Sequence, residues 1–195
     1  MIPTALTEIT HRKDLPAALT KLGLSGFGAE IGVSEGAYSH RILEHSNLCH
    51  LFSIDRWEAY DSAGTMIKET PEQLKYIQAC CKLAPFRTRV SCIRMASLDA
   101  AKIFQNDFFD FIYIDADHSY TMIRQDLEAW WPKLKSGGVF AGHDYWPERP
   151  EGTKYHINNG VQEAVDEFNA KHQLVLHTTI DHHNQNGSWI TQKPL

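Results

Sequence analysis

The stretch FIYIDADHSY, residues 111–120, joins an apolar run to a group of polar residues. The run FIYI is typical of a parallel strand covered on both faces, because no charged residue interrupts it. Asp115, Asp117 and His118 follow it directly. Since carboxylates are costly to bury without partners, this end of the strand must be wet, paired or bound to a metal.

Strand and helix patterns alternate around this stretch. The Asn-Gly pair in DHHNQNG, near the end of the chain, marks a hairpin rather than a helical crossover. The alternation predicts an α/β fold with a mostly parallel, doubly wound sheet of about seven strands that closes with an antiparallel pair. Strands are expected at 28–33, 50–55, 89–95, 109–115, 138–144, 173–180 and 188–192, with helices at 35–46, 70–85, 122–134 (stopped by SGG) and 160–172.

The composition favours one cytoplasmic domain, since a domain usually holds roughly 100–200 residues. The net charge of −5 argues against a nucleic-acid partner, which needs a clustered basic face. No run approaches the roughly 18 apolar residues of a membrane span, and the first residues lack the apolar core of a signal peptide. Cys49, Cys80, Cys81 and Cys92 show no CxxC spacing, so we expect reduced thiols.

The chemically useful residues gather at one edge of the expected sheet. In a doubly wound sheet, ligands bind beyond the carboxyl ends of the strands. Those ends carry Gly32, Asp55, Ala96–Ser97, Asp115–His118 and His143–Asp144. The sequence therefore predicts a ligand site along this edge.

The turn after the first strand reads AEIGVSEG, residues 29–36. A dinucleotide site would show GxGxxG, whereas here Gly32 and Gly36 are separated by three residues and preceded by Glu30. A carboxylate is unfavourable near a pyrophosphate but favourable near an ammonium group, which indicates a cofactor with an amino-acid-like end. Asp55 ends the second strand, where a carboxylate can accept both ribose hydroxyls. An ordinary strand-to-helix turn is the alternative for the glycines, and a helix cap for Asp55.

With these motifs the chain resembles a class I S-adenosylmethionine-dependent methyltransferase. It is most similar to the small, stand-alone bacterial type with D-x-D-H (115–118) and G-H-D-Y (142–145) motifs. The resemblance covers residues 25–192 and implies a Rossmann-like sheet. It also implies one methyltransferase domain, 1–195, made of an N-terminal helical cap (1–24), a cofactor-binding core (25–144), an active-site loop (145–159), and a helix with a C-terminal hairpin (160–195).

The same resemblance implies where S-adenosylmethionine would bind. Glu30 would lie near the methionine amino group, directly or through water, and the glycines would let the backbone approach. The resemblance implies Glu30 and Asp115 at the methionine end of the cofactor and Asp55 at its ribose. Gly32 and Gly36 would let the backbone approach the cofactor closely. The residues implied around the adenine are Arg56 or Trp57, Ala96 and Ser97.

Methyl transfer to oxygen needs an aligned acceptor and removal of a proton. A divalent metal can do both, and metal-dependent relatives of the catechol type carry ligands at the tips of the fourth and fifth strands. That resemblance implies Asp115, His143 and Asp144 as metal ligands here. An imidazole ligand favours Mn²⁺, Fe²⁺ or Zn²⁺ over Mg²⁺, and a site without metal is the alternative.

In those relatives the catalytic base follows the strand-four acid by two or three residues, the places of Asp117 and His118. His118 could serve without a metal, because its ordinary pKa is near 6.5. Asp117 could instead cap the helix that begins near Ser119. Trp146 could line the acceptor pocket, and His156, in the loop after the fifth strand, could contact the substrate.

We therefore predict an S-adenosylmethionine-dependent methyltransferase that acts on an oxygen of a small molecule, with no nucleic-acid or membrane partner. Three loops around a small cleft suit a small acceptor better than a long polymer. A nicotinamide-dependent oxidoreductase is one alternative, which the missing GxGxxG argues against. A non-catalytic S-adenosylmethionine-binding protein is another, which the acidic and histidine residues at the edge argue against. Aromatic residues on the surface make a homodimer a further expectation.

Overall fold

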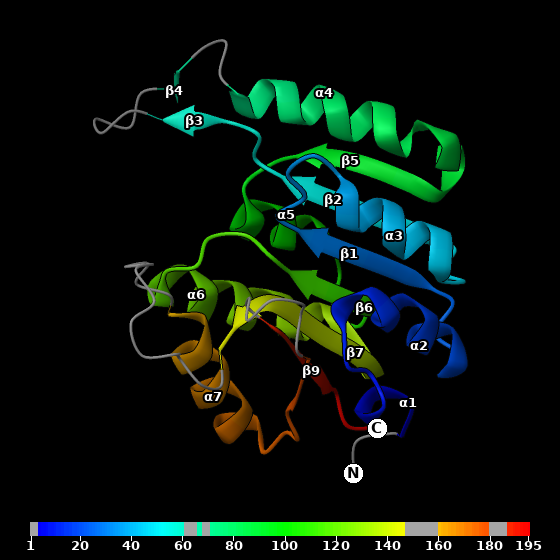
Figure 1. Ribbon diagram of the computed structural model, residues 1–195. Helices are drawn as coiled ribbons and strands as arrows, with labels where there is room; N and C mark the ends of the chain where they lie inside the picture. The colour runs from blue at the N-terminus through cyan, green and yellow to red at the C-terminus, as the bar shows by residue number, and fades with distance from the viewer. Residues whose placement is uncertain (1–3, 61–65, 68–70, 147–159, 180–186) are drawn as a thin grey trace.

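The computed structural model describes residues 4–60, 66–67, 71–146, 160–179 and 187–195, and the structural statements below concern these residues. A seven-stranded sheet forms its centre (Figure 1). The strands are β1 (Phe27–Ile31), β2 (His50–Asp55), β5 (Val90–Arg94), β6 (Phe109–Ile114), β7 (Leu134–Tyr145), β8 (His177–Thr178) and β9 (Gly187–Gln192).

The strand order is β5-β2-β1-β6-β7-β9-β8. The first five strands in this order pair in parallel, and β9 pairs antiparallel with both β7 and β8. This confirms the prediction of a mostly parallel, Rossmann-like sheet with an antiparallel C-terminal hairpin. The carboxyl ends of β5, β2, β1, β6 and β7 consequently meet at one edge.

Helices cover both faces of the sheet (Figure 1). One face carries α5 (Ser97–Ile103), α6 (Tyr120–Trp130) and α7 (Val161–His172). The other face carries α1 (Thr4–Thr7), α2 (Leu15–Lys21), α3 (Ala37–His45) and the end of α4 (Pro71–Leu83). Short 3₁₀ turns, η1 (Arg12–Asp14), η2 (Ala84–Arg89) and η3 (Trp131–Lys133), join some of these elements, and β3 (Ala59–Tyr60) pairs with β4 (Met66–Ile67) apart from the main sheet.

The apolar run in β6 is explained by this double cover. Side chains alternate along a strand, so Phe111 and Tyr113 pack under α2 and α3, while Ile112 and Ile114 pack under α6. All four are essentially inaccessible to water. Burying each such side chain stabilises the fold by roughly 1.5–3 kcal/mol. β6 therefore carries apolar side chains on both faces of the sheet, which is why its sequence is apolar without interruption.

Some boundaries differ from the prediction. The helix expected at 122–134 ends at Trp130, because Pro132 has no N–H to donate to the carbonyl four residues earlier, and a single 3₁₀ turn follows. β7 then begins at Leu134, so the SGG triplet lies inside the strand and does not stop the helix. The strand expected at 173–180 is limited to His177–Thr178.

Two further findings concern the cysteines and the helices. Cys49, Cys80, Cys81 and Cys92 all lie within the described residues and form no disulfide. None of the helices within the described residues is long and apolar enough to cross a membrane.

Candidate active site

A cleft of about 730 Å³ opens at the carboxyl edge of the sheet. It takes in all of the residues implied to bind the cofactor except Gly36. Gly36 lies at the start of α3 in the left-handed conformation, with a φ of 77°. A Cβ there would meet the Cα of Ala79 at 3.1 Å, so this glycine serves helix packing.

Gly32 is where three strands converge. Its N–H donates to the carbonyl of Ile54 at 2.9 Å, and the N–H of Asp115 donates to the carbonyl of Ile31 at 2.7 Å. A Cβ on Gly32 would lie 2.0 Å from the carbonyl oxygen of Asp115, and its φ is +88°. No other residue fits this place, because both the backbone conformation and the close approach require glycine.

Asp55 holds the glycine-rich turn in shape. One carboxylate oxygen accepts hydrogen bonds from the N–H groups of Val33 and Ser34, each at 2.9 Å. The other accepts the N–H of Trp57 at 2.8 Å. The side chain also lines the cleft. Its contact with a ribose remains a prediction, and the structure adds a second task, which is to pin the turn after β1 to the end of β2.

Glu30 is a buried acid, 1% exposed, that nevertheless faces the cleft. Its carboxylate accepts a hydrogen bond from the hydroxyl of Ser39, which lies 2.7 Å from the hydroxyl of Ser53. Burial raises the pKa of Glu30 to about 8, although Ser39 favours the charged form. A cationic group bound beside it would restore the charge, so the site is suited to the ammonium group of a methionine moiety.

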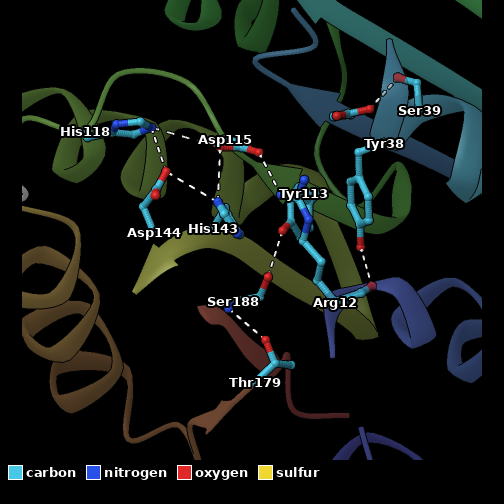
Figure 2. Close-up of polar contacts among 11 residues, drawn as sticks. Arg12, Tyr38, Ser39, Tyr113, Asp115, His118, His143, Asp144, Thr179 and Ser188 are labelled. Carbon is cyan, nitrogen blue, oxygen red and sulfur yellow. Dashed lines mark hydrogen bonds and ion pairs between the residues drawn. The ribbon is translucent and has the colours of Figure 1, made fainter. Parts of the chain in front are cut away.

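Arg12 is a residue of the cleft that the sequence did not indicate. Its guanidinium lies 3.2 Å from a carboxylate oxygen of Asp115 and 4.8 Å from the ring centre of Tyr38 (Figure 2). The Tyr38 hydroxyl donates to the Arg12 carbonyl at 3.1 Å. No linear pattern connects Arg12 with Asp115, which are 103 residues apart. Through this arginine, the N-terminal segment contributes to the cleft.

Asp117 and His118, the two expected bases, have different surroundings. Asp117 accepts the N–H of Ser119 at 2.8 Å, just before α6, and hydrogen bonding to Ser119, through its side chain first and its backbone second, lowers the pKa of the Asp117 carboxyl. The Nε2 of His118 lies 2.8 Å from Asp144, and that hydrogen bond raises the pKa of His118 (Figure 2). Asp117 is therefore engaged with the backbone, whereas His118 is oriented by a buried carboxylate.

Asp144 adopts a backbone conformation that is uncommon for a residue other than glycine. Its φ is +60°, and the register between β7 and β9 shifts between Gly142 and Tyr145. Such left-handed positions cost of order 1–3 kcal/mol and gather at functional sites. The bulge turns the Asp144 carboxylate toward His118, from a strand tip next to the one that carries Asp115.

The tips of β6 and β7 also bring together a set of metal-ligand types. Ligand atoms of Asp115, His118 and Asp144 all lie within 4.8 Å of one another. This group differs in one member from the expected Asp115, His143 and Asp144. The Nδ1 of His143 lies 3.5 Å from Asp144 and 3.9 Å from Asp115, so it borders the group. Burial raises the pKa of Asp115, although His143 and Arg12 favour its charged form.

The two expected substrate residues are placed differently. Trp146 directly follows β7 and is half-buried, close in sequence to Asp144. His156 lies outside the described residues. Neither contact with a substrate is tested by these positions, and both remain predictions.

Comparisons with known proteins agree with this architecture. A family model described as a methyltransferase domain matches residues 29–145. No curated protein matched. Among solved structures, a protein from Corynebacterium glutamicum is similar with a TM-score of 0.66 and 17% identity, over 93% of this chain and 81% of that one.

Two further solved structures show how widely the fold is used. An O-methyltransferase from Bacillus cereus, in complex with SAH, has a TM-score of 0.64 and 16% identity, over 98% of this chain and 84% of that one. Spermidine synthase from Thermotoga maritima has a TM-score of 0.60 and 14% identity, over 97% and 59%. At these identities the likenesses establish the fold alone, and the family follows from the matched model. This chain belongs to the class I S-adenosylmethionine-dependent methyltransferases.

Proposed function

We propose that this protein transfers the methyl group of S-adenosylmethionine to an oxygen of a small molecule, with His118 as the proton acceptor. The observation that carries the proposal is the 2.8 Å contact between His118 and Asp144 at the border of the cofactor cleft. His118 lines the cleft, and Asp144 is buried behind it. A histidine oriented by a buried carboxylate is a recurring arrangement for a general base.

The roles of the two residues follow from the reaction. The acceptor oxygen attacks the methyl carbon, the carbon–sulfur bond breaks, and S-adenosylhomocysteine leaves with the electron pair on sulfur. The acceptor's hydroxyl proton must go to a base. Asp144 favours the tautomer of His118 with the proton on Nε2, which leaves the lone pair on Nδ1 to accept it. Asp144 would then stabilise the imidazolium that forms.

A small acceptor is supported by how little the chain adds to the cofactor fold. Beyond the sheet and its covering helices, the described residues contribute short 3₁₀ turns, the two-stranded β3–β4 pair and connecting segments. The net charge of −5 gives no support to a polyanionic acceptor such as a nucleic acid. The O-methyltransferase from Bacillus cereus supports oxygen as the acceptor atom, on the basis of its fold.

A divalent ion is the second candidate for promoting proton removal. Asp115, His118 and Asp144 would hold it, and a mixed carboxylate and imidazole set fits Mn²⁺, Fe²⁺ or Zn²⁺ better than Mg²⁺. Such an ion would lower the pKa of a hydroxyl bound to it. The guanidinium of Arg12, 3.2 Å from Asp115, competes for one of these carboxylates, which is why we place the histidine first.

The test is a screen for methyl transfer followed by two variants. Release of S-adenosylhomocysteine would be measured with hydroxylated aromatic and sugar acceptors, with and without a chelator. His118→Gln and Asp144→Asn should lose turnover but still bind S-adenosylhomocysteine, while His45→Gln, an exposed histidine of α3, should behave like the wild type. Full methyl-transfer activity in both His118→Gln and Asp144→Asn would disprove the proposal that His118, oriented by Asp144, accepts the proton. Loss of wild-type activity on chelation, with Mn²⁺ or Zn²⁺ binding by calorimetry that Asp144→Ala abolishes, would favour the metal.

A further inference from the structure

Arg12 is a cation that lies directly against the group of metal-ligand types, Asp115, His118 and Asp144. Its guanidinium donates a hydrogen bond to Oδ2 of Asp115 at 3.2 Å, and its side chain is 31% exposed. The other oxygen of Asp115, Oδ1, faces the histidines, with the Nε2 of His118 at 4.0 Å and the Nδ1 of His143 at 3.9 Å. The Asp115 carboxylate is therefore shared between an arginine on one side and the histidines on the other (Figure 2).

The guanidinium of Arg12 is held in place by aromatic side chains as well as by Asp115. It lies 4.8 Å from the ring centre of Tyr38, whose hydroxyl donates to the Arg12 carbonyl at 3.1 Å. The Arg12 side chain is also hydrogen-bonded to that of Tyr113. Although burial by itself lowers the pKa of Arg12, Tyr113 and Asp115 raise it overall. Arg12 is therefore a fixed group that carries a permanent charge.

The backbone on both sides of Arg12 is tied to the rest of the fold. His177 of β8 donates from its Nε2 to the carbonyl of Ile9 at 2.8 Å. Arg41 of α3 donates from its Nε to the carbonyl of Lys13 at 2.8 Å. Arg12 lies between these two anchored points, so its contact with Asp115 differs from an ion pair between two mobile surface side chains, which would contribute little.

The charge of Arg12 acts against a divalent ion at this group. The carboxylates of Asp115 and Asp144 would attract such an ion, whereas the guanidinium would repel it. Repulsion between like charges a few Å apart is strong in a partly buried site, because solvent and salt screen it weakly. The hydrogen bond from Arg12 also takes one of the two Asp115 oxygens, which leaves the other one for a ligand.

We infer that Arg12 takes the place of a divalent ion at the tips of β6 and β7, and that removing its charge would turn the group of Asp115, His118 and Asp144 into a metal site. The inference deepens the proposed function and rests on it, since it takes this edge as the place of the chemistry and decides for the histidine against the ion. Arg12 is a positioning residue here, because it acts through the Asp115 carboxylate that it orients and balances.

The test measures binding of Mn²⁺ by calorimetry, without cofactor or acceptor. We expect the wild type to bind Mn²⁺ more weakly than about 1 mM, and Arg12→Met, which keeps a long side chain without the charge, to bind it at least about tenfold more tightly. Arg12→Lys keeps the charge and should bind like the wild type. Lys13→Met is the matched control, because it removes a positive charge from an exposed residue of the same turn, and it should also bind like the wild type.

Binding of Mn²⁺ by the wild type with a Kd on the order of micromolar would overturn the inference without any variant, even if Arg12→Met failed to fold. Equal binding by the wild type and a folded Arg12→Met would overturn it as well. Binding in Arg12→Met that survives the addition of Asp144→Ala would do the same, because the ion would then lie elsewhere. A failure of the proposed function is distinguishable from these results: methyl transfer retained in His118→Gln would remove the proposed base, whereas Mn²⁺ binding is measured without any turnover.

Discussion

The cofactor cleft and the His118–Asp144 cluster sit at the same edge of the sheet but are held together differently. At the glycine-rich turn of the cleft, the contacts are made with backbone: Asp55 accepts three main-chain N–H groups, and Gly32 lies against the carbonyl of Asp115. In the cluster, side chains hold side chains, with His118, His143 and Asp115 all within 4.0 Å of at least one neighbour in the group.

This difference separates binding from chemistry. A site built from backbone tolerates little change in shape, because each donor is tied to a turn. A site built from side chains at two strand tips can change its chemistry by substitution without altering the sheet. We therefore expect variants in the cleft to affect folding and cofactor binding, and variants in the cluster to affect turnover.

The largest effect should come from His118→Ala. Removing a general base lowers the rate of the chemical step by about 10²–10⁴-fold. The affinity for S-adenosylhomocysteine should change little, because the His118 side chain is held by Asp144 at the border of the cleft, away from the contacts that Asp55 makes with the glycine-rich turn. Single-turnover kinetics and calorimetry measure the two quantities. A parallel fall in affinity would show that the cluster also builds the cleft.

Gly32→Ala should be next, with a loss of stability of on the order of 3 kcal/mol or more, because its methyl group would collide with the Asp115 carbonyl. Urea unfolding of the cofactor-free protein measures the free energy of unfolding. Gly23→Ala is the matched control: its φ is +75° but nothing lies within 4 Å of the new methyl, so only about 1 kcal/mol should be lost. Equal losses in the two variants would contradict the close approach.

Glu30→Gln should make stability less dependent on pH. The folded pKa of Glu30, about 8, is above its ordinary value of 4.5. The stability associated with the neutral form is thus fully present below pH 4.5 and lost as the pH rises through 8. Relative to the wild type, the variant should gain roughly 1–3 kcal/mol between pH 4 and 9, since one pKa unit corresponds to 1.36 kcal/mol.

Urea unfolding at several pH values measures this difference, and the same variant should bind S-adenosylhomocysteine more weakly because the ammonium group loses its counter-charge. A parallel pH profile for variant and wild type would mean that Glu30 is charged in the folded protein throughout. If Glu30→Gln bound S-adenosylhomocysteine as tightly as the wild type, the ammonium group of the ligand would not lie beside Glu30.

The smallest effect on turnover should come from Asp117→Ala. Its carboxylate accepts the Ser119 N–H before α6, so losing it should cost about 1 kcal/mol of stability, as for other residues that satisfy a helix start. Turnover at a temperature where the variant is folded should stay within a few-fold of the wild type. A loss of turnover as large as that of His118→Ala would indicate that Asp117 is the base.

Sequence reasoning predicted the features that depend on neighbours in the chain. The alternation of strand and helix, the glycine turn after β1 and the polar residues at the strand ends can be read from local patterns, and the sheet confirms the architecture. The end of α6 was misjudged because a glycine triplet was taken as the stop, whereas Pro132 imposes it earlier.

The sequence by itself determined the fold class, the edge of the sheet at which the cleft opens and several of the residues that line it, because strand periodicity and turn chemistry are local. Only the tertiary structure decided which of those residues meet. Arg12 reaches Asp115, His118 reaches Asp144 and Ser97 reaches Asp126 through the packing of segments that are 26 or more residues apart. Such contacts depend on strand order and helix placement, so no pattern along the chain specifies them.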